Sequence, residues 1–143
     1  MELGTFGAIL TFALEFEGKI SRFYSDAAKA VGAGEVSDKF GELAAAGEKR
    51  LKVLERTRRE CVAEMILEPI RGFRSEDYPL DSDVASGSDA KRLLSRALAI
   101  QDTAVGYYST ASEKVSVPEV SRILQKIAKQ HREQKDDLEG LVQ

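Results

Sequence analysis

The residues best suited to chemistry in this chain are polar side chains that fall where an apolar helical stripe is expected. One stripe, on the second expected helix, passes through Gly47 and Arg50, and another, on the last expected helix, passes through His131 and Gln134. A glycine in a helix interior costs roughly 1 kcal/mol relative to alanine, and a buried arginine is costly unless it is paired. We therefore expect a compensating acidic or polar partner in the core.

His131, the only histidine, could act as a general base, but no nucleophile with matching spacing accompanies it. We therefore predict a buried polar network in which Arg50 reaches Glu17 in an ion pair, and Gly47 leaves room for the guanidinium group or a water. The remaining hydrogen bonds of this network are assigned to Gln101, His131 and Gln134. Such a network is stable only if every member is hydrogen-bonded.

Four helices must position these side chains. Apolar residues recurring at steps of three and four predict helices over residues 4–31, 36–64, 89–115 and 118–141. Gly32 and Gly34 between the first two helices, and Pro118 before the last, are typical of tight helical hairpins. Between the hairpins, residues 66–87 lack this periodicity and contain prolines, glycines and acidic residues, which predicts an irregular crossover.

The two hairpins match each other in sequence. Residues 13–55 align without a gap onto residues 97–139 at a constant offset of 84, and 12 of the 43 pairs are identical. Chance supplies only about three identities at ordinary residue frequencies. About twenty extended residues, at ~3.3 Å each, can run the length of a bundle, whereas an up-down-up-down bundle needs shorter links. We predict a single all-α domain, residues 1–143, with a ferritin-like four-helix bundle and one long crossover.

Two segments and their repeats resemble a known family. Residues 17–24 and 43–50, repeated at 101–108 and 127–134, are similar to rubrerythrin-type members of the ferritin-like superfamily. This resemblance implies a di-iron centre held by a glutamate on helices one and three and an E-x-x-H pair on helices two and four. The corresponding positions in this chain are Glu17, Gln101, Gly47, Arg50, His131 and Gln134.

This set of side chains is poorly suited to iron. Glu17 alone matches the family pattern, and His131 stands where a carboxylate is expected. Two divalent irons are normally balanced by about four carboxylates, whereas these positions supply one carboxylate and one cation. We predict a degenerate site with no metal, no cofactor and no catalytic residue. Three tyrosines would be redox-active beside a metal and packing residues without one: Tyr24, Tyr107 and Tyr108.

Composition limits the function classes. The chain has a net charge of −3, 43% apolar and 31% charged residues, values typical of a soluble globular protein. The only basic stretch, residues 49–59, contains Glu55, and we expect no nucleic-acid binding. The single Cys61 excludes an internal disulfide and favours a reducing cytoplasm. We expect neither a leader peptide nor a membrane span, because residues 1–4 carry no basic segment and no apolar run approaches ~20 residues.

Three functions remain for such a chain, and we favour a non-catalytic one. The first is a bundle that acts through protein–protein contacts, as a homodimer or with another protein, through residues 6–12 or the crossover residues Phe73 and Tyr78. The alternative is a rubrerythrin-like di-iron oxidoreductase or peroxide reductase with atypical ligands, although the cysteine-rich iron domain of rubrerythrins is missing. A third possibility is a small-molecule site in the polar cavity near Gly47.

Overall fold

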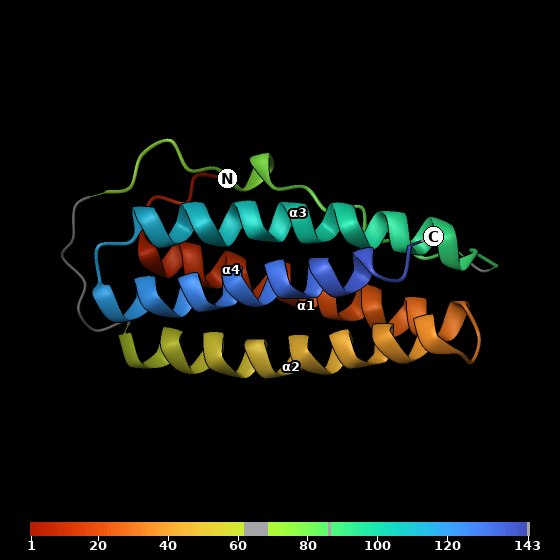
Figure 1. Cartoon of the computed structure of the whole chain (residues 1–143). Helices are drawn as coiled ribbons and strands as arrows, with labels where there is room; N and C mark the ends of the chain where they lie inside the picture. The colour runs from red at the N-terminus through yellow and green to blue at the C-terminus, as the bar shows by residue number, and fades with distance from the viewer. Residues whose placement is uncertain (62–68, 86, 143) are drawn as a thin grey trace.

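The computed structural model describes residues 1–61, 69–85 and 87–142, and within them four long helices form a bundle (Figure 1). The helices are α1 (Phe6–Ala30), α2 (Glu35–Cys61), α3 (Ala90–Lys114) and α4 (Pro118–Glu139). Helices α1 and α2 pack closely together, as do α3 and α4, while α1 also contacts α3 and α2 contacts α4. These contacts confirm the predicted all-α architecture of two helical hairpins.

Local sequence signals set several of the helix ends. The Thr5 hydroxyl accepts a hydrogen bond from the Ala8 amide at 3.0 Å and caps α1, and Asp89 caps α3 through the Arg92 amide at 2.8 Å. Gly32 has a φ of +71° in the turn after α1, a conformation that favours glycine. Pro118 begins α4, as predicted.

Two predicted helix boundaries need correction. The first helix begins at Phe6 rather than residue 4, because the amino-terminal residues pair with the crossover instead: the Leu3 amide donates to the Phe73 carbonyl at 2.8 Å. The last helix ends at Glu139 rather than residue 141, because the Gly140 amide closes its final turn on the Asp136 carbonyl. Residues 62–64, predicted to end the second helix, lie outside the described residues.

Residues 69–85 of the connection between the hairpins run along the outside of the bundle, and α2 and α3 point in the same direction (Figure 1). The described residues of this connection include one short 3₁₀ helix, η1 (Ser75–Asp77). The Phe73 side chain, 1% exposed, stacks on Tyr107 with ring centroids 5.5 Å apart. Phe73 therefore anchors the described part of the crossover to the core.

This packing changes the interpretation of the regions suggested for partner contacts. Phe6 and Phe73 are at most 4% exposed, and Tyr78 packs edge-on against Tyr107. In residues 6–12 only Thr11 is exposed, and Phe12 packs against Phe16 and Tyr107. Both regions serve intrachain packing. No helix in the part of the chain that the structure describes has the length and apolar character needed to cross a membrane.

Candidate functional site: a polar network at the bundle centre

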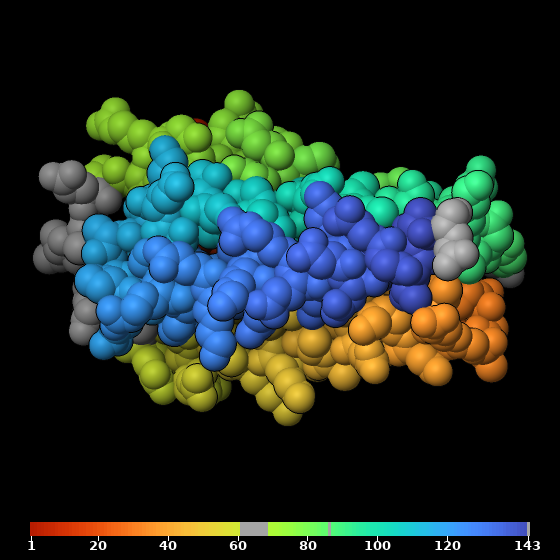
Figure 2. All heavy atoms as spheres, in the orientation of Figure 1, coloured from red at the N-terminus to blue at the C-terminus, as the bar shows by residue number. Residues whose placement is uncertain are grey.

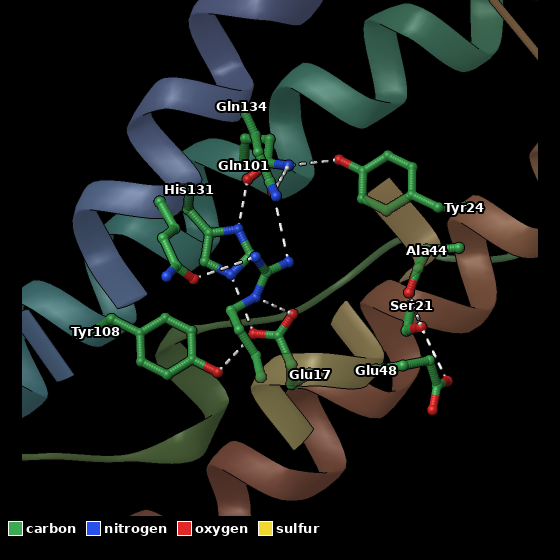
Figure 3. Close-up of polar contacts among 11 residues, drawn as sticks. Glu17, Ser21, Tyr24, Ala44, Glu48, Gln101, Tyr108, His131 and Gln134 are labelled. Carbon is green, nitrogen blue, oxygen red and sulfur yellow. Dashed lines mark hydrogen bonds and ion pairs between the residues drawn. The ribbon is translucent and has the colours of Figure 1, made fainter. Parts of the chain in front are cut away.

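Each of the four helices contributes one charged or polar side chain to the centre of the bundle (Figure 3). These side chains are no more than 4% exposed: Glu17, Arg50, Gln101 and His131. The Arg50 Nε donates to Glu17 Oε2 at 2.9 Å, which confirms the predicted buried ion pair. Together with Gln134, Tyr24 and Tyr108, these residues are called the polar network below.

The second carboxylate oxygen of Glu17 accepts two further hydrogen bonds. The Tyr108 hydroxyl donates to Glu17 Oε1 at 2.8 Å, and His131 Nε2 lies 3.0 Å from the same atom. The Tyr108 ring is also stacked on the His131 imidazole, with an interplanar angle of 10°. One carboxylate is therefore the shared acceptor for three donors from three other helices.

Two glutamines complete the opposite side of the network. Gln134 Oε1 accepts from Arg50 Nη2 at 3.4 Å and from Gln101 Nε2 at 3.3 Å. Gln101 Nε2 also lies 2.6 Å from the Tyr24 hydroxyl, and Gln101 Oε1 lies 2.6 Å from His131 Nδ1. Among the described residues, every buried side-chain nitrogen and oxygen has a hydrogen-bond partner, as a stable buried network requires.

Both ring nitrogens of His131 are used within the network. Nδ1 lies 2.6 Å from Gln101 Oε1, and Nε2 lies 3.0 Å from Glu17 Oε1. The imidazole ring therefore links the carboxylate of α1 to the side-chain amide of α3.

The surroundings of Glu17 keep it ionised. Burial by itself would raise the pKa of this carboxyl group, but His131, Arg50 and the Tyr108 hydroxyl outweigh burial and lower the pKa of Glu17 to about 2. Burial, followed by the negative charge of Glu17, raises the pKa of Tyr108 well above its usual value, so its hydroxyl stays a donor. The network thus holds an ionised carboxylate against Arg50, His131 and Tyr108.

Gly47 has a different role from the predicted one. A Cβ atom at this position would lie 2.9 Å from the Cβ of Ser21 on α1. The glycine therefore permits close approach of α1 and α2, and it does not provide space for the Arg50 guanidinium group. Ser21 uses this proximity to donate a hydrogen bond to the Ala44 carbonyl at 2.9 Å.

This contact predicts opposite effects for two glycine substitutions on α2. We expect Gly47→Ala to lower the free energy of unfolding by about 1–3 kcal/mol, because an atom attached directly to the backbone must displace Ser21. Gly41→Ala is the matched control, since its Cβ would meet nothing within 4 Å and should stabilise the helix by about 0.5–1 kcal/mol. Urea denaturation measures the free energy of unfolding of both variants. A stabilised Gly47→Ala would contradict the role of Gly47 in the close approach of α1 and α2.

The network includes two residues that sequence reasoning did not assign to it. Tyr24 and Tyr108 were expected to be packing residues, yet their hydroxyls bind Gln101 and Glu17. Their spacing could have assigned them to the network. Tyr24 follows Glu17 by seven residues, and Tyr108 follows Gln101 by seven, which is two helical turns along the same face.

The residues present do not fit a di-iron centre. Only Glu17 and His131 could ligate a metal among the six positions, and Arg50 holds a positive charge 2.9 Å from the carboxylate. No group of three or more His, Cys, Asp or Glu residues suited to a metal ion occurs in the residues that the structure describes. A carboxylate ligand at position 47 would also collide with Ser21.

Comparisons with protein-family models, with curated proteins and with solved structures found no match to this chain. The resemblance to rubrerythrin-type proteins therefore depends on the spacing of the site positions and on the internal repeat. The geometry above supports a helical bundle whose centre is closed by an ionic network.

Proposed function

We propose that this chain is a non-catalytic, ferritin-like helical bundle related to rubrerythrins, and that it acts by binding other molecules. The observation that carries this proposal is the position of the polar network. Its members occupy five of the six positions at which the related family holds iron, and they satisfy one another's hydrogen bonds. Covalent catalysis needs an activated nucleophile, and metal catalysis needs an open coordination position. The side chains of the polar network are bonded to one another and offer neither.

The proposed protein contacts, with a second copy of the chain or another protein, would be polar ones. Among the described residues, the exposed large hydrophobic side chains are Met1 and Val142, near opposite termini. An obligate dimer usually buries a large apolar surface, whereas transient interfaces are about as polar as the rest of a protein surface. We therefore propose reversible contacts, and a cytoplasmic location remains our expectation from the single Cys61.

Elemental analysis of protein purified without chelator tests the non-catalytic proposal. We expect substoichiometric iron, because the Glu17 carboxylate is already held by Arg50 and His131. Two irons per chain, together with peroxide reduction, would establish the alternative di-iron oxidoreductase. A single bound ion that is lost in Glu17→Gln and retained in Glu15→Gln would place a metal at Glu17 and His131, and this too would overturn the proposal.

Sedimentation velocity across a range of concentrations tests the contact part of the proposal. We expect a reversible shift towards a dimer at high concentration, or co-purification of a stoichiometric partner that dissociates in salt. A strictly monomeric chain with no such partner would contradict it.

A further inference from the structure

A cavity of about 450 Å³ lies between α2 and α4, directly outside the polar network. These two helices lie side by side on the face of the molecule shown in Figure 2. The volume is within the range of roughly 300–1,000 Å³ found for small-molecule sites. Arg50 lines this cavity together with Gln130 and Gln134, the two residues that accept hydrogen bonds from its Nη atoms. The outer end of the guanidinium group therefore forms part of the inner wall.

Arg50 has unused hydrogen-bonding capacity on that side. A guanidinium group has five N–H donors, and Arg50 makes three hydrogen bonds within the described residues. The bond from Nε to Glu17 is short, 2.9 Å, whereas the bonds from the Nη atoms to Gln130 and Gln134 are 3.5 and 3.4 Å. Typical N–H···O bonds measure about 2.7–3.2 Å. The Nη side is thus held weakly, by neutral amides only.

The way Arg50 is paired points to an anion. It meets the Glu17 carboxylate through Nε only, and its Nη atoms face the neutral amides of Gln130 and Gln134. Guanidinium groups bind carboxylates most strongly through two parallel N–H···O bonds. The Nη side of Arg50 is therefore suited to a second carboxylate.

The lining of the cavity suits an anion that carries an apolar group. Three exposed basic side chains surround the opening: Lys49, Arg56 and Lys126. They are accompanied by Glu133 and by Asp137, the latter 3.7 Å from Lys39. The remaining wall is apolar and consists of Ala46, Val53, Ile123 and Ile127.

We propose that this cavity binds a small carboxylate on a short apolar chain, with the carboxylate on the Arg50 Nη atoms. It would replace two long bonds to amides with a charge-assisted, bidentate pair. The apolar chain would lie against Ile123 and Ile127. This inference rests on the proposed function, because it takes the centre of the bundle to be free of metal.

Calorimetric titration of the metal-free protein with octanoate tests the site. We expect saturable binding of one molecule per chain. Acetate, which lacks the apolar chain, and 1-octanol, which lacks the charge, should each bind at least about tenfold more weakly. Equal binding of 1-octanol and octanoate would show that Arg50 does not recognise the charge and would overturn the proposal.

Two variants locate the binding without changing the polar network. Ala46→Phe places a large ring in the cavity and should weaken octanoate binding at least about tenfold. Ala45→Phe, one residue away, exposed and outside this cavity, should bind octanoate as the natural chain does. No saturable binding to the natural chain, or undiminished binding to Ala46→Phe, would overturn the inference. Stoichiometric iron would instead refute the proposed function, so the two failures are distinguishable.

Discussion

Replacing Glu17 by glutamine is expected to lower the free energy of unfolding by about 3–5 kcal/mol, the usual cost of removing one partner from a buried ion pair. The change keeps the size of the side chain but removes the carboxylate that faces both Arg50 and His131. A carboxylate accepts at both oxygens, whereas a glutamine amide places an NH₂ group at one of them. That NH₂ would face donors, either the Arg50 Nε or the Tyr108 hydroxyl and His131 Nε2.

Chemical denaturation of the natural chain and two variants measures this effect. Glu15→Gln is the matched control, because Glu15 lies on the same helix, is exposed and has no hydrogen bond or ion pair within the described residues. Its effect should stay within about 0.5 kcal/mol. Arg50→Leu should cost less than Glu17→Gln, because Glu17 then keeps His131 as a partner. Equal stability of the natural chain and Glu17→Gln would show that the charge of Glu17 contributes nothing to the free energy of unfolding.

Most of the fold could be predicted from the sequence because its determinants are local or repeated. Helix periodicity, the Asp89 cap and Pro118 each act within a few residues, and the internal repeat supplies the pairing of hairpins. The pairing of the amino terminus with the crossover could not be predicted. It joins Leu3 to Phe73, far apart in sequence, through backbone hydrogen bonds that leave no side-chain pattern.

The centre of the site was predictable for a different reason. A cation on an apolar stripe requires a buried anion, and Glu17 was the carboxylate at the related position on another helix, so the Arg50–Glu17 pair followed from charge and register. The roles of Tyr24 and Tyr108 did not follow, because helical periodicity places a ring in the core without setting the direction of its hydroxyl. The role of Gly47 depended on the distance between α1 and α2, which periodicity does not specify.

The asymmetry of the repeat explains how one scaffold holds this network. The paired tyrosines, Tyr24 and Tyr108, keep the same residue type but bind different partners, a glutamine and a glutamate. A symmetric centre with glutamates at positions 17 and 101 would bring two carboxylates together and require metal or protons to balance them. With Gln101, the same geometry needs only hydrogen bonds and the Arg50 cation of α2.

Acid is expected to remove the stabilisation that the Glu17 charge provides. The pKa of Glu17 is lowered in the folded state from its usual 4.5 to about 2, against the effect of burial and chiefly through His131 and Arg50. A carboxyl group with a depressed pKa stabilises the fold fully above its unfolded pKa, and this contribution is lost as the pH falls towards the folded pKa. The loss should therefore occur between pH 4.5 and about 2 and amount to about 3 kcal/mol.

A ¹³C titration of the glutamate carboxyl groups, combined with denaturation at each pH, measures this effect. Glu76 must be separated from Glu17, because its pKa is also lowered to about 2, by the hydrogen bond from the amino terminus. Glu76 is exposed, so its contribution to the pH dependence of the free energy of unfolding should disappear in Glu76→Gln and in high salt. The contribution of the buried Glu17–Arg50 pair should not change with salt. A Glu17 midpoint near 4.5 would mean that neither Arg50 nor His131 stabilises the carboxylate, and the ionic centre of the bundle would then be refuted.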